Sequence, residues 1–246
     1  LTEPYRLCSR QHCQVYAGAG HEDPRTTAAV NATQGEVLVS KEGRLVDTVY
    51  SSSCGGHTED NDRVWGGAPD GALRGRLDAA GAGGAFALID DHNVAAFLAQ
   101  TAEESAAYCS KGGRGAGGSF RWRTPIAIDA VAEKHHLGAL TAIEIKARGV
   151  SGRVSQLELV GTRQRVTING ELQVRRALGS LKSALFILEV ARDGSGAIER
   201  ATAIGGGHGH GIGMCQYGAA GQAAAGRTYR EILGSYYQGA TVKKLY

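Results

Sequence analysis

A glycine-rich segment near the C-terminal end, GGGHGHGIGMCQYGAAGQAAAG from Gly205 to Gly226, limits the structures that this chain can adopt. Seven glycines lie between Gly205 and Gly218. Ordering a glycine costs more backbone entropy than ordering any other residue, so this density predicts unusual backbone angles or a close approach to another group. A flexible linker is the alternative, but linkers rarely carry His, Met, Cys and Tyr together. We interpret the segment as a loop that binds a ligand through His208, His210, Gln216 and Tyr217.

Composition excludes several classes of protein. The chain has 246 residues, of which 42% are hydrophobic and 21% are charged, so it can bury a substantial core. The formal net charge of +3, without any block of Lys or Arg, gives no indication of nucleic-acid binding. No stretch approaches the roughly 18 apolar residues of a membrane span, and the opening residues LTEPYRLCSRQ lack the apolar region of a signal peptide. We therefore expect no nucleic-acid partner and no transmembrane segment in this chain.

Alternating apolar residues predict three pairs of strands. The segments GEVLVS and RLVDTVYS form the first pair, as a hairpin around the turn at Lys41–Gly43. Two strands are expected between Leu140 and Gly161, and the segment Leu185–Val190 is expected to pair with Ala197–Ile204.

Helices are predicted between and after these strands. One is expected over Arg25–Gln34, one after Asn93, and one that opens at Thr124–Pro125 with proline in its first position. The segment from Asn169 fits either a hairpin turn or the start of a short helix, and this stays open. Two helices are expected at the C-terminal end, the second with a capping box of Thr228 and Glu231. The predicted fold is α+β and rich in β-structure, with its core in residues 1–66 and 151–246 and an inserted lobe at 67–150.

The segment CSRQHC, from Cys8 to Cys13, places two thiols and the imidazole of His12 within six residues. Zinc prefers such ligands, but a closed tetrahedral site needs a fourth. In an oxidising compartment, Cys8 and Cys13 could instead form a small disulfide loop. The chain has five cysteines, an odd number, so at least one is unpaired or bound to another group. A zinc site, a disulfide and free thiols are the three alternatives.

The loop SSSCGGHTEDN, Ser51–Asn61, gathers hydroxyls, a thiol, an imidazole and Glu59 directly after a predicted strand. Loops at strand ends often carry function, and Cys54 with the nearby His57 could form a nucleophile and its base. The alternative is a polar turn that uses its glycines for shape only.

Two further motifs have a structural and a functional interpretation. The segment FRWR, Phe120–Arg123, could present an aromatic ring and two guanidinium groups to a sugar, or Trp122 could fill the core. His208 and His210 lie two residues apart, so in an extended chain both rings point to similar sides. They could bind a metal, transfer protons or contact a ligand, and satisfied structural histidines are the alternative.

Several motifs together resemble the stage II sporulation protein D family (SpoIID/LytB). GHGHGIGMCQYGAAGQAAAGRTYREILGSYYQGATVKKLY is similar to the closing GHGxGM(S/C)QYGAxG signature of that family. YSSSCGGHTEDNDRVWGG is similar to its strand-loop motif, in which Gly-Gly-x-Thr-Glu precedes Val-Trp. CSRQHCQVYAG, FRWR, RGVSGRV and VRRALG…LKSALF follow in the family's order. The resemblance covers nearly the whole chain and implies a single SpoIID/LytB-like domain over residues 1–246.

The resemblance implies an extracytoplasmic protein of the cell envelope that acts on peptidoglycan glycan strands. Sporulation members are lytic transglycosylases, which cut glycan strands stripped of stem peptides and leave 1,6-anhydro ends. One carboxylic acid protonates the glycosidic oxygen and then, as a base, helps the sugar's own C6 hydroxyl to attack, so a second carboxylate is not needed. Other members are amidase enhancers, and a noncatalytic peptidoglycan-binding partner of a cell-wall amidase is the alternative function. A cysteine hydrolase that uses Cys54 is a third.

The sequence departs from the family at the catalytic acid. The family's glutamate lies in an N-terminal Val-x-x-x-Glu-Met-Pro motif, and neither this motif nor the following Ala-Gln-Ala-Val-Ala-Ala-Arg-Thr run occurs in these residues. We expect the acid to come from upstream of Leu1 or to have been lost, and the isolated chain to be weakly active or inactive. Glu59 is the candidate if a carboxylate of this chain substitutes.

The resemblance also implies roles for individual residues. No cofactor is required for the chemistry, but a structural zinc in some members favours the metal interpretation of Cys8, His12 and Cys13, with a fourth ligand from elsewhere. The two glycine-rich motifs are expected to meet and line a glycan groove, in which the glycines allow close approach of the sugar. The residues expected to bind the glycan are Ser53, Cys54, His208, His210, Gln216 and Tyr217.

Overall fold

A computed structural model describes residues 17–81, 86–113 and 115–246 of the chain. It contains runs of helices and runs of antiparallel strands, which confirms the α+β fold predicted from the sequence. The chain divides into two compact units, one of residues 1–37 with 242–246 and one of residues 38–241. No helix in the described ranges combines the length and the apolar character needed to cross a membrane.

The smaller unit carries the first predicted helix, α1 (Pro24–Ala32), which follows the 3-10 helix η1 (Ala19–His21). Asp23 caps α1, and its carboxylate accepts a hydrogen bond from the backbone N–H of Arg25 at 2.8 Å. The strands β1 (Glu36–Val39) and β10 (Thr241–Lys244) form a two-stranded sheet.

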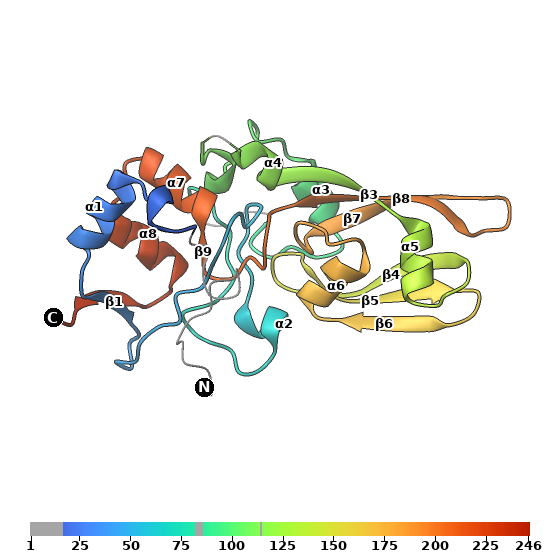
Figure 1. Cartoon of the computed structure of the whole chain (residues 1–246), viewed down its shortest axis with the longest axis horizontal. Coiled ribbons are helices and arrows are strands. Elements are labelled where there is room, and N and C mark those ends of the chain that lie inside the picture. The colour runs from blue at the N-terminus through green and yellow to red at the C-terminus, as the bar shows by residue number, and fades with distance from the viewer. Residues whose placement is uncertain (1–16, 82–85, 114) are drawn as a thin grey trace. The chain divides into compact units, whose positions relative to one another are not determined.

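The larger unit is built on two antiparallel sheets of three strands each (Figure 1). In the first sheet, β8 (Ile198–Gly206) lies between β3 (Arg121–Ile126) and β7 (Phe186–Arg192). In the second, β5 (Val154–Gly161) lies between β4 (Leu140–Arg148) and β6 (Arg165–Asn169). These sheets confirm the strand pairs predicted over 140–161 and 185–204.

One hydrophobic cluster joins the two sheets. Leu157 and Leu159 of β5 pack with Phe186 of β7 and Ala203 of β8, and all four are fully buried. Val174 of α6 (Glu171–Ala177) completes the cluster from the side of the helix. The chain after Asn169 therefore forms a short helix and not a hairpin turn.

The remaining elements of the larger unit are short. A two-stranded parallel pair is formed by β2 (Tyr50–Ser51) and β9 (Met214–Cys215). The other helices are α2 (Asn61–Trp65), α3 (Val94–Ala99), the 3-10 helix η2 (Tyr108–Ser110), α4 (Ala116–Phe120), α5 (Ile128–Lys134), α7 (Gln216–Ala224) and α8 (Tyr229–Tyr236). The two C-terminal helices confirm the prediction, including the capping box of Thr228 and Glu231.

One predicted helix starts later than expected. Thr124 and Pro125 do not open a helix but lie in β3, and α5 begins at Ile128. Because β3 is an edge strand, the missing N–H of Pro125 costs no hydrogen bond on the open side of the sheet. Residues 67–150 supply β3 and β4 to the two sheets, and the inserted lobe stays a prediction.

Candidate functional site

The two glycine-rich motifs lie side by side in the larger unit. The backbone N–H of His208 donates to the carbonyl oxygen of Ser53 at 2.8 Å, and the N–H of Ser53 donates to the carbonyl oxygen of His208 at 3.1 Å. Further along, the N–H of Glu59 donates to the carbonyl oxygen of Gly211 at 2.9 Å. The parallel pair β2–β9 continues this contact. Isolated backbone bridges and one short parallel pair of strands therefore hold the two motifs together.

The glycines at this junction serve close packing within the protein. A Cβ atom added at Gly55 would lie 2.7 Å from the backbone nitrogen of Gly207. A Cβ atom at Gly211 would lie 2.3 Å from the guanidinium carbon of Arg153, and Gly211 has a φ of +80°. These positions require glycine because protein atoms fill the space that a side chain would need. A sugar was expected to approach the backbone there, and at these two positions protein atoms do so instead.

The residues predicted to bind glycan differ widely in exposure. Ser53 and Cys54 are fully buried, His210 and Tyr217 are half-buried, and His208 and Gln216 are exposed.

His210 makes two hydrogen bonds within the junction. Its Nδ1 accepts a bond from the N–H of Ile212 at 3.0 Å, so Nε2 carries the hydrogen and faces the carbonyl oxygen of Tyr50 at 3.0 Å. Burial, aided by the charge of Arg153, lowers the pKa of His210 to about 4. The ring therefore remains neutral at physiological pH and orders the loop around it.

Glu59 joins the junction to the turn after β4. Its carboxylate accepts hydrogen bonds from the N–H groups of Asp60 and Val150, each at 2.9 Å. The N–H and hydroxyl of Ser151 donate to Oε2 at 3.2 and 2.6 Å. Glu59 is 1% exposed, and this arrangement favours an anchoring role. Its catalytic role stays a prediction.

The two tryptophans have opposite environments. Trp122 of the FRWR motif is 7% exposed and belongs to the main hydrophobic cluster, so the core interpretation of this motif is correct and sugar stacking on it is wrong. Trp65, at the end of α2, is 54% exposed, and its ring centroid lies 5.1 Å from that of His210. Trp65 is therefore an exposed aromatic ring of the site, as is Tyr50, which is 51% exposed.

Three cysteines and one aspartate converge beneath the junction. Cys54, Asp78, Cys109 and Cys215 are all buried, and one potential ligand atom from each lies within 4.8 Å of every other. This set of donors could hold a metal ion. The odd number of cysteines was the signal in the sequence, but Asp78 and Cys109 carry no motif that would have identified them. Cys8, His12 and Cys13, the predicted zinc ligands, lie outside the described residues.

Burial also changes the acid–base properties of this cluster. Burial raises the pKa of the Cys54 thiol. It also raises the pKa of the Cys215 thiol to about 12 and the pKa of the Asp78 carboxyl to about 7. The anionic forms of these three groups are therefore unfavourable unless a cation lies among them. At Cys109 burial acts in the same direction, but hydrogen bonds with Cys215 and Cys54 outweigh it and lower the pKa of this thiol.

The environment of Cys54 does not suit a nucleophile. His57 does not pair with its thiol, since Nδ1 lies 2.7 Å from the carbonyl oxygen of Thr58 and Nε2 lies 3.0 Å from that of Ala87. The thiol of Cys54 instead donates to Asp78 at 3.2 Å. A buried thiol of raised pKa without a base is unreactive, so the cysteine hydrolase hypothesis has no support in this geometry.

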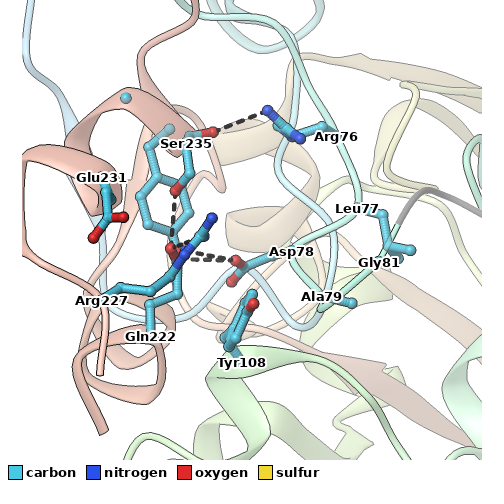
Figure 2. Close-up of a pocket in the computed structure, with 12 residues that line it drawn as sticks. Arg76, Leu77, Asp78, Ala79, Gly81, Tyr108, Gln222, Arg227, Glu231 and Ser235 are labelled. Atoms are coloured by element: carbon cyan, nitrogen blue, oxygen red, sulfur yellow. Dashed lines mark hydrogen bonds between the residues drawn. The ribbon is translucent and has the colours of Figure 1, made fainter. Parts of the chain in front are cut away.

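A pocket of about 390 Å³ borders this cluster, with Asp78 in its lining (Figure 2). Tyr236 donates its hydroxyl hydrogen to Oδ1 of Asp78 at 2.8 Å, and the amide of Gln222 approaches the same oxygen at 3.5 Å. Arg227 in turn donates to the side-chain oxygen of Gln222 at 2.7 Å, as Figure 2 shows. Side chains of α7 and α8 thus fix the orientation of the Asp78 carboxylate.

Comparison with known proteins gives two family matches and two relatives. Residues 59–213 match the family described as Domain of unknown function (DUF8618), and residues 2–39 match the family described as Stage II sporulation protein (SpoIID). An Amidase enhancer of Bacillus subtilis (strain 168) is 26% identical over 252 residues, which cover 93% of this chain and 34% of that protein. An uncharacterized protein of Brachyspira hyodysenteriae (strain ATCC 49526 / WA1) is 25% identical over 239 residues, which cover 97% of this chain and 54% of that protein.

The two kinds of match differ in extent. The short match to SpoIID, together with the similarity to the amidase enhancer, supports a relationship to the SpoIID/LytB family. The chain spans about half or less of the length of these two relatives. The DUF8618 match is longer than half of the chain and includes all the strands of both three-stranded sheets. On this evidence the chain belongs to the DUF8618 family.

Proposed function

We propose that this chain is a cell-envelope protein that binds the glycan strands of peptidoglycan, in the manner of an amidase enhancer. The SpoIID match over residues 2–39 and the similarity to the Bacillus subtilis amidase enhancer support this assignment. The two glycine-rich motifs also support it, because they resemble motifs of the SpoIID/LytB family.

The observation that carries the proposal is the exposed face at the junction of the two motifs. Trp65 offers an apolar indole face to solvent, beside the ring of His210. An exposed aromatic ring with polar neighbours is typical of a binding surface, and the apolar face of a sugar ring can stack on it. His208 is exposed on the adjacent loop, where it can donate to hydroxyl or acetamido groups.

Positive charge lies next to this face. Burial lowers the pKa of His208, and the nearby charges of Arg175 and Lys182 act in the same direction. Muramic acid residues without a stem peptide carry a free carboxylate, which such cations would attract. This complementarity favours glycan strands from which the stem peptides have been removed.

A lytic transglycosylase is the second candidate function. The match to SpoIID over residues 2–39 is the observation that favours it. Four donors enclose the carboxylate of Glu59, which is 1% exposed, so a glycosidic oxygen has no path to it without a rearrangement. We therefore propose that cleavage, where it occurs, uses a carboxyl group supplied from outside the described residues.

Sedimentation with purified, peptide-free glycan strands tests the binding function. The parent chain should co-sediment with the strands, and Trp65→Ala should weaken binding by about tenfold or more. Val190→Ala is the matched control, because Val190 is 41% exposed on β7, in the first three-stranded sheet. Equal binding by the Trp65→Ala variant and the parent would contradict the proposal.

Product analysis of the same mixtures separates the two candidate functions. Binding without 1,6-anhydro products, together with faster hydrolysis by a cell-wall amidase when the chain is added, supports the enhancer. Release of 1,6-anhydro products by the chain supports the transglycosylase instead.

A further inference from the structure

The buried cluster of Cys54, Asp78, Cys109 and Cys215 has the donor set and the spacing of a closed zinc site. The sulfur atoms of Cys54 and Cys109 lie 3.7 Å apart, and Oδ2 of Asp78 lies 3.2 Å from the sulfur of Cys54. Two sulfur atoms at about 2.3 Å from one zinc ion are about 3.8 Å apart in a tetrahedron. The observed separation therefore agrees with shared coordination of one ion, and it is far longer than a disulfide bond of about 2.05 Å.

The four donors come from four separate segments. Cys54 follows β2, Asp78 lies in the loop that lines the pocket, Cys109 belongs to η2, and Cys215 ends β9 directly before α7. Such convergence without local sequence spacing places side chains from both glycine-rich motifs around one point.

Neighbouring groups orient these donors as the outer shell of a metal site does. The N–H groups of Cys54 and Gly218 donate to the sulfur of Cys215 at 3.1 and 3.2 Å, at the N-terminal end of α7. Both contacts fix the position of this sulfur and, with the helix dipole, offset part of the cost of burying a metal-bound thiolate there. On the carboxylate of Asp78, Oδ1 accepts a hydrogen bond from the hydroxyl of Tyr236, and Oδ2 faces the thiol of Cys54.

A partly buried cation, Arg121, lies beside the cluster. Arg121 donates to four carbonyl oxygens, which belong to Gly55, Leu98, Phe97 and Phe120. Within the described residues it has no carboxylate partner, and its charge interacts with the sulfur atoms of Cys109 and Cys54. Buried charges are normally paired or bound to metals. Zinc carries two positive charges, and each thiolate and the carboxylate carries one negative charge, so the site would have a net charge of −2 and Arg121 would neutralise half of it.

We propose that Cys54, Asp78, Cys109 and Cys215 bind one structural zinc ion. Four protein ligands fill the tetrahedron, so the ion has no open position for a substrate. Its role is to tie both glycine-rich motifs to η2 and α7. Metal binding and folding of this region are therefore coupled.

Metal analysis of the full chain tests the proposal, in a Cys8→Ser/Cys13→Ser background that removes the other thiols. Expressed with zinc and purified under reducing conditions, this background should contain one zinc per chain. X-ray absorption should give sulfur neighbours at about 2.3 Å and a shorter oxygen neighbour. Cys109→Ser in this background should lose the zinc.

Tyr236→Phe provides a variant that keeps all four donors and the ring. It should lower the zinc affinity by about 10–100-fold, as measured by chelator competition, because Asp78 loses its orienting hydrogen bond. Tyr229→Phe, on the exposed part of α8, should leave the affinity unchanged. This pair keeps the proposal testable if Cys109→Ser does not fold.

Three results would overturn the proposal. The first is a folded background chain that is free of zinc and lighter by two hydrogen atoms, which indicates a disulfide among the three thiols. The second is a bound zinc without sulfur neighbours. The third is a zinc affinity that Tyr236→Phe leaves unchanged.

Discussion

Trp122 donates its indole N–H to the carbonyl oxygen of Gly207 at 2.8 Å. This bond connects the main hydrophobic cluster, to which Trp122 belongs, with the glycine-rich loop that carries His208. The first strand of one sheet therefore supports the backbone of the candidate site directly.

Replacement of Trp122 by Phe should weaken this support. The change leaves the carbonyl oxygen of Gly207 without its donor and removes part of a buried ring, so the free energy of unfolding should fall by about 1–3 kcal/mol or more. Denaturant unfolding followed by circular dichroism measures the change. Trp65→Phe is the control, since Trp65 is exposed and its loss should change stability by about 0.5 kcal/mol or less. Equal effects of the two substitutions would contradict the assigned role of Trp122.

Glu59→Gln should destabilise the fold. One carboxylate oxygen becomes an amide group that faces the N–H donors of Val150 or Ser151, so at least one buried hydrogen bond is lost, at a cost of about 1–3 kcal/mol. The midpoint and slope of urea unfolding check this. Glu189→Gln serves as the exposed control, because Glu189 forms a surface ion pair with Arg123. If Glu59→Gln kept the stability of the parent but lost a glycan-cleaving activity that the parent has, Glu59 would instead act as a catalytic acid.

Gly211→Ala should be more destabilising than Gly226→Ala. Both residues have a positive φ, +80° at Gly211 and +85° at Gly226. The backbone strain of alanine should therefore lower the free energy of unfolding by a similar amount at each position, about 1–2 kcal/mol. Only at Gly211 would the new Cβ meet a neighbour, the guanidinium group of Arg153, and overpacking adds about 1–3 kcal/mol. Thermal and denaturant unfolding of the two variants measure the difference. Similar losses at the two positions would show that Arg153 moves away without cost.

Stability should fall as the pH falls from about 6.5 towards 4, in part through His210. Its pKa is about 4 in the folded chain and about 6.5 when unfolded, so the unfolded state binds more protons in this range. This histidine should contribute a loss of about 2 kcal/mol between pH 7 and pH 5. His210→Gln should therefore show a smaller decrease between these two pH values than the parent, as measured by urea unfolding. His92→Gln, which changes an exposed histidine, controls for the loss of an imidazole. If the stability of His210→Gln fell as much as that of the parent, the assignment would be contradicted.

Local signals in the sequence predicted much of the fold. Alternation in Leu140–Gly161 and the capping box at Thr228 depend on neighbours close in the chain, and both were predicted correctly. The helix expected at Pro125 was wrong because pairing with β8, far along the chain, overrides the local preference.

The candidate site was harder to predict for the same reason. The meeting of the two glycine-rich motifs was expected from a family resemblance, and the contact of Ser53 with His208 agrees with it. The convergence of Asp78 and Cys109 on Cys54 depends entirely on tertiary structure, since no spacing between these residues forms a recognisable ligand motif. The exposure of Trp65 and the burial of Trp122 likewise depend on packing, because both tryptophans lie in similar polar surroundings in the sequence.

The parallel pairing of β2 with β9 has a consequence for how the molecule is made. Tyr50 meets Met214 and Ser51 meets Cys215, so the two strands of this pair are synthesised far apart in time. Contacts between such distant residues form slowly, because a long loop must close before any pairing energy is gained. The sheet of β4, β5 and β6 can assemble during translation before β9 has been made, whereas the junction of the two glycine-rich motifs has to wait for β9.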